Sequence, residues 1–191
     1  MARYIISDHH FGHANIIEYT DRPFTSVGQM DDVMLRRHYE VVSADDVLVH
    51  LGDVAMDMQD GRETIEYFEQ LDGDLLVRGN HDVGLSPADA PFPVVESCVL
   101  EHDGFEFYCT HRPQHIPDDW DGWAIHGHEH NNHPEEYPFV AADERRVNVS
   151  VELLDFRPLR LADLTALLDV CPPHSRLRDR ETAMEACDWS Y

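Results

Sequence analysis

Three groups of ionisable and amide side chains each follow a short apolar run in the first half of this chain, and two more follow apolar runs in the second half. If the first three runs are parallel strands of one sheet, their carboxyl ends meet at one edge, where such sheets form binding sites. We therefore expect all five groups to converge. They are Ser7-Asp8-His9-His10, His50-Leu51-Gly52-Asp53, Arg78-Gly79-Asn80-His81-Asp82, Thr110-His111-Arg112-Pro113 and His126-Gly127-His128-Glu129-His130.

The donor atoms in these groups favour divalent transition metals. Carboxylate, imidazole and amide ligands suit Mn, Fe, Zn, Co or Ni rather than Ca. Seven candidate ligands exceed what one tetrahedral ion accepts, whereas two ions that share a bridging carboxylate would use them all. Two ions ~3.5–4 Å apart stabilise both the attacking and the leaving oxygen in phosphoryl displacement. The pattern therefore predicts a two-metal centre that cleaves phosphate esters.

The five groups also resemble a known family. Asp8-x-His10, Gly52-Asp53, Gly79-Asn80-His81-Asp82, His111 and Gly127-His128-x-His130 look like the five signature motifs of the calcineurin-like metallophosphoesterases, in family order. Phe11-Gly12-His13-Ala14-Asn15 and Asn148-Val149-Ser150-Val151 look similar to a small single-domain branch from bacteria, archaea and phages. The resemblance implies a four-layer αββα sandwich of two mixed β-sheets flanked by helices.

The resemblance also implies a role for each motif residue. Asp8, His10 and His130 would ligate the first metal. Asn80, His111 and His128 would ligate the second metal, and Asp53 would bridge both ions. Mn is the expected metal, with Fe, Zn, Co or Ni as alternatives.

The implied reaction is hydrolysis of a phosphomonoester or phosphodiester by a hydroxide that bridges the two metals. Asp53, Asn80 and His81 would be catalytic, and His81 would stabilise the phosphoryl oxygens or protonate the leaving alkoxide. One position departs from the family pattern. Many relatives carry an Asp or His three residues after the bridging Asp, where this chain has Met56. Asp57, Asp82 or a backbone carbonyl would then orient His81.

Several other polar residues lie near the motifs. His13 is the preferred substrate contact, because Gly12 allows the chain to turn back toward the site. Arg112 suits a phosphate clamp, since a guanidinium pairs well with phosphate oxygens, and a surface ion pair is the equal alternative. Three roles are compatible with His9, His50 and His126: support of the ligands, contact with the substrate, or packing. Isolated histidines are interpreted as surface or satisfied imidazoles: His38, His102, His115, His133 and His174.

The first half of the chain alternates between two kinds of apolar pattern. Strand-like runs occupy 3–7, 46–51 and 74–77, and helical spacing marks 29–42 and 60–71. This alternation predicts a parallel α/β core.

In the second half, strand-like runs lie closer together. Those at 94–100, 105–110, 123–126 and 146–153 lack long helices between them, which favours antiparallel or mixed pairing. A closing helix is expected at 161–170. Residues 1–170 are expected to form one domain, and 171–191 a C-terminal tail or short helix.

The chain is strongly acidic, with 38 Asp and Glu against 14 basic residues, all of them Arg, and a net charge of −24. The acidic residues are spread along the chain, which is typical of proteins from halophilic microbes, where salt screens self-repulsion. This charge disfavours nucleic acid and anionic membranes as partners. A small phosphate-ester or nucleotide-like substrate can still enter a site where metal cations dominate the local field.

The sequence shows neither a membrane-spanning segment nor a secretory signal. No apolar run approaches the ~20 residues of a membrane helix, and the N-terminus has no secretory apolar region. The four cysteines lack C-x-x-C spacing and are interpreted as reduced thiols. A cytoplasmic protein is expected, and its oligomeric state stays open.

Two other functions compete with the small-substrate phosphoesterase. One is a nuclease or protein phosphatase of the same family, which the short length and the acidity disfavour. The other is a non-catalytic binding scaffold with the same fold. A decayed scaffold should have replaced ligands, and all seven are present here.

The interpretation of the acidic surface can be tested by thermal melting in KCl. The melting temperature should rise between about 0.1 M and about 2 M KCl, because salt screens repulsion among the carboxylates. An unchanged or lower melting temperature in molar KCl would contradict the halophilic interpretation.

Overall fold

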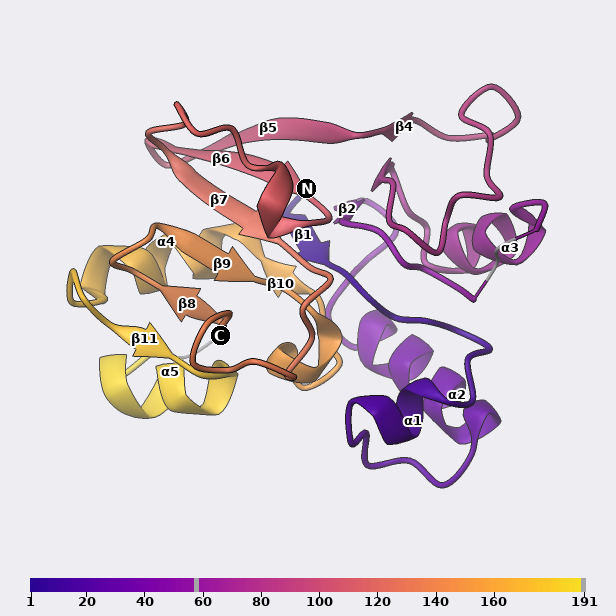
Figure 1. Cartoon of the computed structure of the whole chain (residues 1–191), viewed down its shortest axis with the longest axis horizontal. Coiled ribbons are helices and arrows are strands. Elements are labelled where there is room, and N and C mark those ends of the chain that lie inside the picture. Colours follow the sequence, from indigo (N-terminus) through magenta and orange to yellow (C-terminus); the bar gives the residue numbers. More distant parts are fainter. Residues whose placement is uncertain (57–58, 190–191) are drawn as a thin grey trace.

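The computed structural model describes residues 1–56 and 59–189, which form two mixed β-sheets flanked by helices (Figure 1). The first sheet has the order β10-β1-β2-β3-β4. Its first four strands along the chain run parallel, and β10 is antiparallel to β1. The predicted α/β class and the parallel core are therefore confirmed. The strands are β1 (Arg3–Ile6), β2 (Val47–His50), β3 (Leu75–Val77), β4 (Val94–Val95) and β10 (Leu159–Arg160).

The second sheet has the order β11-β8-β9-β7-β6-β5. Strands β6, β7 and β9 are parallel neighbours, while β5, β8 and β11 are each antiparallel to the strand beside them. The predicted mixed pairing is confirmed. The strands are β5 (Ser97–His102), β6 (Phe105–Thr110), β7 (Trp123–His126), β8 (Val140–Ala141), β9 (Arg146–Asn148) and β11 (Arg176–Leu177).

The single strand predicted at 94–100 is wrong, because the chain changes sheets within it. β4 pairs with β3 in the first sheet, whereas β5 pairs with β6 in the second. Figure 1 shows β4 and β5 as one nearly continuous ribbon along the top of the molecule. Glu96 lies between them and pairs with the Arg78 guanidinium. Both short strands carry apolar side chains, so apolar patterning alone merges them.

The strand predicted at 146–153 is too long. β9 ends at Asn148, and the 3-10 helix η2 (Val151–Leu154) follows. The side-chain oxygen of Asn148 accepts the backbone N–H of Ser150 at 3.1 Å, which turns the chain out of the sheet. The apolar side chains of η2 are buried. A compact turn thus buries the same apolar side chains that the predicted strand would have buried.

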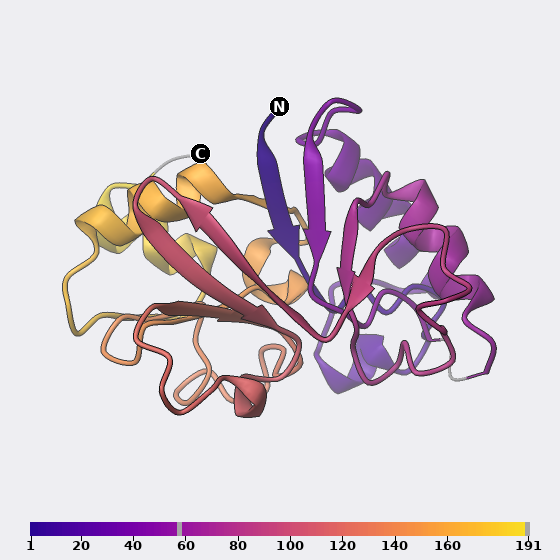
Figure 2. The same ribbon diagram turned by 90° about the horizontal axis from the view of Figure 1, so that it is seen from above.

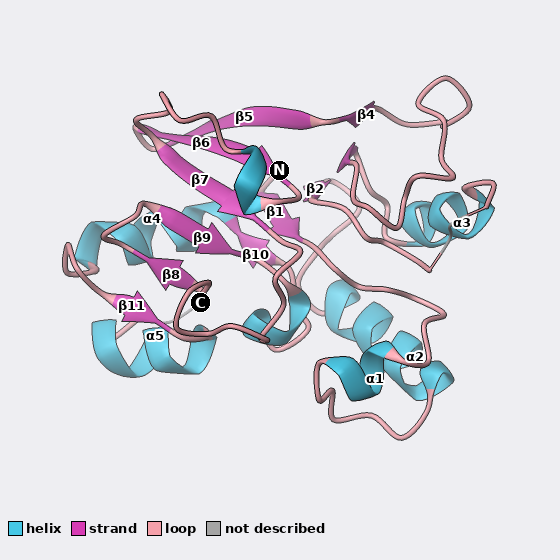
Figure 3. Ribbon diagram, viewed as in Figure 1, coloured by secondary structure: helices cyan, strands magenta, loops and turns pink. Residues whose placement is uncertain are grey.

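Helices lie on the outer sides of the sheets (Figures 2 and 3). α2 begins after Ser26, whose hydroxyl accepts the N–H of Gln29 at 3.2 Å. α4 packs against β1, β10 and β5, and α5 packs against α4 and β11. The helices are α1 (Ile16–Tyr19), α2 (Val27–Tyr39), α3 (Arg62–Gln70), η1 (Pro113–His115), α4 (Leu161–Val170) and α5 (Arg180–Cys187).

The helix predicted at 161–170 is confirmed as α4. Within 171–189, β11 and α5 are ordered elements, and the predicted domain boundary at 170 stays a prediction. No helix in residues 1–56 and 59–189 combines the length and the apolar character that crossing a bilayer requires.

The two sheets are joined where the candidate site lies. Ser7, directly after β1, forms a parallel bridge with Ser150, which follows β9. The Ser7 N–H donates to the Val149 carbonyl at 3.0 Å, and the Val151 N–H donates to the Ser7 carbonyl at 3.2 Å. In Figure 2, β1 (indigo) and β2 (purple) run side by side toward this junction. Loops from both sheets therefore reach one place.

Buried neutral histidines make the fold sensitive to acid. His38 on α2 is 1% exposed, and burial lowers its pKa from 6.5 to about 4. Burial likewise lowers the pKa of His50 to about 3 and that of His126 to about 4. Between pH 6.5 and the folded pKa, the unfolded chain binds protons that the folded chain does not. Stability therefore falls as the pH falls through this window.

We predict that His38→Leu reduces the loss of stability on acidification. Wild type should lose about 2 kcal/mol through His38 between about pH 7 and about pH 5, and the variant should not. Thermal melts at the two pH values measure the difference. His174→Leu is the control, because His174 is exposed in the folded protein. An equal pH dependence in wild type and both variants would contradict the prediction.

Candidate metal centre

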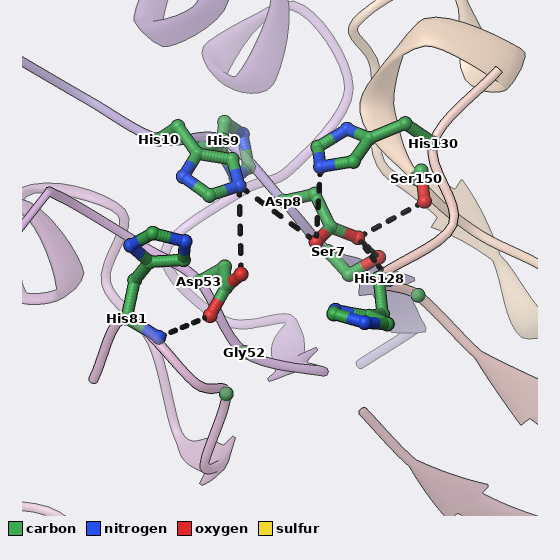
Figure 4. Close-up of polar contacts among 12 residues, drawn as sticks. Ser7, Asp8, His9, His10, Gly52, Asp53, His81, His128, His130 and Ser150 are labelled. Carbon is green, nitrogen blue, oxygen red and sulfur yellow. Dashed lines mark hydrogen bonds and ion pairs between the residues drawn. The ribbon is translucent and has the colours of Figure 1, made fainter. Parts of the chain in front are cut away.

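The two carboxylate oxygens of Asp8, which follows β1, have different surroundings (Figure 4). Oδ2 accepts the Ser7 hydroxyl at 2.6 Å and the backbone N–H of His128 at 3.0 Å. The Ser150 hydroxyl lies 3.0 Å from the same oxygen. Oδ1 is buried and has no hydrogen-bond partner among the described residues. The carboxylate is thus held by one oxygen, and the other is open to a cation.

Asp82 ties the loop that carries Asp53 to the loop after β3. Its Oδ2 accepts the backbone N–H of Asp53 at 2.7 Å and that of Gly79 at 2.8 Å. Its Oδ1 accepts the N–H of Val54 at 3.2 Å. Because the Asp82 side chain is fully buried, these donors fix the spacing of the two loops.

The Asp53 carboxylate lies between imidazoles from the two halves of the molecule. Its Oδ2 is 3.5 Å from Nε2 of His10 and 3.4 Å from Nε2 of His111. Its Oδ1 accepts the backbone N–H of His81 at 2.8 Å. One oxygen orients the carboxylate, and the other faces both histidines.

The potential ligands form three adjoining groups, and within each group the ligand atoms lie within 4.8 Å of one another. Neighbouring groups share a member: His10 belongs to the first and second, and Asp53 to the second and third. A carboxylate shared between groups is the arrangement that a two-ion centre requires. The groups are Asp8 with His10 and His130, His10 with Asp53 and His81, and Asp53 with His111 and His128.

Asn80 adds an amide oxygen to the third group. This oxygen lies 3.1 Å from Nε2 of His111. Nδ1 of His111 is 2.8 Å from the Leu51 carbonyl, to which its N–H donates, so Nε2 faces Asn80 and Asp53. All seven predicted ligands therefore lie in one site, and their assignment to two ions stays a prediction.

Unpartnered buried atoms show that these residues fit a metal. Asp8 Oδ1 and both ring nitrogens of His10 are buried without a hydrogen-bond partner among the described residues. Each such atom costs roughly 1–3 kcal/mol if nothing binds it. A divalent cation between Asp8, His10 and His130 would give the carboxylate oxygen and the imidazoles a partner.

The pKa values reflect the same crowding. Burial would raise the pKa of Asp53, but His111 and His10 outweigh burial and hold the pKa well below its ordinary value. Burial would lower the pKa of His111, but Asp53 raises it to about 9. Against burial, Glu152 and Asp8 raise the pKa of His130 to about 9. Both shifts favour the protonated imidazole, so a metal that binds a ring nitrogen would compete with a proton there.

His81 lies beside the ligands, with its ring centroid 4.9 Å from that of His10. Its Nδ1 is buried and unpartnered within the described residues, so no backbone carbonyl there orients it. The suggestion that Asp82 orients His81 is wrong, because that carboxylate accepts backbone N–H groups instead. Asp57, the remaining candidate, lies outside the described residues.

Both predicted substrate contacts border the site. The ring centroid of His13 is 5.6 Å from that of His10 and 6.2 Å from that of His81. Arg112 lines a pocket of about 250 Å³ together with Asn80 and His111. Within residues 1–56 and 59–189, no acidic side chain pairs with Arg112. The alternative of a surface ion pair therefore has no described partner.

Three neighbouring histidines support the ligand loops. His9 Nδ1 lies 2.8 Å from Nε2 of His50, and Nδ1 of His50 accepts the Gly52 N–H at 3.1 Å. His126 donates through Nδ1 to the Gly127 carbonyl at 2.9 Å. All three side chains are buried, and their hydrogen bonds stabilise the loops that carry the candidate ligands.

The ligands occupy an unusual backbone conformation. Five of the seven have positive φ, between 51° and 71°, a region that non-glycine residues adopt rarely. Such strain persists where the surroundings enforce it, and it clusters at functional sites. The five are Asp8, His10, Asp53, His128 and His130.

Glycines in the motifs permit close approach of the loops. A methyl group on Gly127 would overlap the Ser7 hydroxyl and Asp8 Oδ2. A methyl group on Gly79 would overlap the carboxylate and backbone of Asp53. Packing therefore requires glycine at both positions.

Sequence reasoning did not identify the residues that hold the ligands from behind. Ser7 and Ser150 contact Asp8, and the Asn148 amide donates to the His130 carbonyl at 3.1 Å. Glu152 contacts Nδ1 of His130 at 3.0 Å. The polar residues inside the apolar segment 148–153 were the signal available, because isolated polar groups in a buried run need partners.

We predict that Gly127→Ala weakens metal binding, because the added methyl displaces Asp8 Oδ2 from its donors. Metal content after dialysis against Mn²⁺ or Zn²⁺, measured by elemental analysis, should fall relative to wild type. Gly28→Ala is the matched control, since a methyl group there meets open space. Equal metal content in the two variants would contradict the proposed packing.

Comparison with protein-family models finds no match. Among solved structures, a protein of unknown function from Aquifex aeolicus, AQ665, has a TM-score of 0.65 and 26% identity, covering 87% of this chain and 98% of that one. YfcE, a phosphoesterase from E. coli, has a TM-score of 0.45 and 19% identity, covering 78% of each chain.

A curated relative is more similar in sequence. The uncharacterized protein MJ1445 of Methanocaldococcus jannaschii is 36% identical over 168 residues, which cover 87% of this chain and 90% of the relative. Identity at this level over nearly the whole of both chains, together with the geometry above, places them in one family. The chain belongs to the family of the uncharacterized protein MJ1445.

Proposed function

We propose that this protein is a metal-dependent hydrolase of phosphate esters. The observation that carries the proposal is the position of Asp53, whose Oδ2 faces both His10 and His111. This carboxylate lies between two sets of candidate ligands, and each set combines residues that follow strands of both sheets. Two adjacent divalent cations bound there would supply an activated water and charge neutralisation for phosphoryl displacement.

The chain's own residues have distinct parts in the proposed reaction. Asn80 and His111 line the pocket of about 250 Å³, and Asp53 lies beside His111. His81 borders this group and can hold a proton for the leaving oxygen. Arg112 supplies a guanidinium with no described acidic partner, which suits a phosphate oxygen. His13 is the second proposed substrate contact.

The resemblance of the five motifs to the calcineurin-like metallophosphoesterases supports this proposal. We retain Mn as the proposed metal, with Fe, Zn, Co and Ni as alternatives. The proposed substrate is a small phosphate ester or nucleotide-like molecule in the cytoplasm, and origin in a halophilic microbe is also a proposal. A nuclease or protein phosphatase remains the second candidate, and the net charge of −24 disfavours nucleic acid as the substrate.

The test is hydrolysis of p-nitrophenyl phosphate and bis-p-nitrophenyl phosphate by protein first stripped with a chelator. Activity should be absent after chelation and return with Mn²⁺. The ratio of the two rates separates a monoesterase from a diesterase. Silence toward both compounds and toward a wider phosphate-ester library, with every candidate metal, would favour a binding scaffold and contradict the proposal.

Variants identify the residues responsible. His81→Ala should lower kcat about 100-fold or more, because general acid catalysis is lost. Arg112→Met should chiefly raise KM, since a clamp binds the ground state and the transition state alike. Arg178→Met is the matched control, because that arginine is exposed. Full activity of Asn80→Ala or His81→Ala would contradict the assigned roles.

A further inference from the structure

A buried ion pair lies behind the candidate metal ligand His130. The Arg22 side chain is 0% exposed and the Glu152 side chain 4% exposed. Arg22 donates to Glu152 Oε1 through Nε at 2.9 Å and through Nη2 at 2.7 Å. The same oxygen lies 3.0 Å from Nδ1 of His130, and Oε2 lies 3.2 Å from it. Carboxylate, guanidinium and imidazole thus form one continuous chain.

The arrangement determines which nitrogen of His130 is open. Because Glu152 pairs with Arg22, it remains a carboxylate and can only accept a hydrogen bond. Nδ1 of His130 must therefore carry a hydrogen and donate it to Glu152. Nε2 then points the other way, 3.8 Å from Asp8 Oδ1, which has no other partner among the described residues. The two atoms face each other at a distance that an ion between them can bridge.

Arg22 also fixes the backbone of the first motif. Its Nη2 donates to the Asp8 carbonyl at 2.8 Å, and its Nη1 donates to the His9 carbonyl at 2.7 Å. The guanidinium therefore joins the loop of Asp8 to the residue that holds His130. Breaking the pair leaves either a buried cation beside a cation site or an unpaired buried carboxylate.

We propose that the ion pair of Arg22 and Glu152 is a positioning unit that keeps Nε2 of His130 open toward the metal position beside Asp8. It acts through His130 and touches neither substrate nor metal. Carboxylates that accept from a metal-bound histidine orient the ring and raise its basicity, and losing them costs about 10–100-fold in metal affinity. This inference rests on the proposed metal-dependent function and assigns new residues to it.

The first experiment compares Zn²⁺ titrations of wild type and Glu152→Gln by calorimetry, with bound metal counted by elemental analysis. Wild type should bind two ions. Glu152→Gln should bind one of them about 10–100-fold more weakly and leave the other unchanged. Asp155→Asn is the matched control, because it also replaces a carboxylate by an amide, next to η2. The Asp155 side chain is 55% exposed and pairs with Arg37 at 2.7 Å.

A second measurement reports on the His130 ring. Long-range ¹H–¹⁵N correlation spectra of Zn²⁺-loaded wild type should show His130 protonated at Nδ1 and bound through Nε2. In Glu152→Gln this signature should be weakened or lost, whereas a merely structural role for Glu152 would leave it unchanged. His130→Ala should weaken binding at the same metal position, and adding Glu152→Gln to it should cost little more affinity.

The Glu152→Gln chain can fail to fold, because it leaves the Arg22 charge buried. The double variant Arg22→Met with Glu152→Gln removes both charges beside Met30, whose sulfur already lies 3.3 Å from Nη1. It should fold and still bind the ion beside Asp8 weakly. Unchanged affinity at both positions in a folded variant would overturn the inference. A wild type that binds no pair of ions would instead overturn the proposed function.

Discussion

The buried carboxylate of Asp82 is the contact on which the candidate centre depends most. It accepts backbone N–H groups from the loop after β2 and from the loop after β3, and so holds Asp53 next to Gly79. Burial and the charge of Asp53 raise the pKa of Asp82 to about 6. The backbone donors therefore stabilise a carboxylate that would otherwise take up a proton near neutrality. Without the hydrogen bonds of Asp82, the candidate ligands of these two loops would not be held next to each other.

Three of the candidate ligands are each held through one atom, which leaves a second atom open toward the site. Asp8 is fixed through Oδ2, Asp53 through Oδ1, and His111 through Nδ1. A buried side chain that is hydrogen-bonded through one atom cannot rotate to find a partner for its other atom. The site therefore keeps unpaired donors and acceptors. Unpaired carboxylate oxygens and ring nitrogens of this kind are available to coordinate a metal ion.

Charge links the site to the rest of the molecule. The chain carries a net charge of −24, yet Arg112 at the rim has no described acidic partner. Inside, Asp53 raises the pKa of His111, Glu152 and Asp8 raise the pKa of His130, and Arg22 pairs with Glu152. The charge of Arg22 is permanent, whereas a bound cation would compete with protons on the two imidazoles. For the proposed anionic ester, the charges inside the site therefore matter more than the net charge of the chain.

The sequence by itself determined which candidate ligand side chains are present and that they follow the strands, at one edge of the sheet. Asp8, Asp53 and Asn80 follow parallel strands directly, and strand direction follows from alternation with helices, which is a local pattern. The tertiary structure alone decided what supports them. The change of sheets between β4 and β5, the bridge of Ser7 with Ser150, and the pairing of Arg22 with Glu152, 130 residues apart, depend on contacts between distant segments. Local periodicity records whether a side chain is buried. It does not record which side chain it meets, because that is set by the packing of the whole chain.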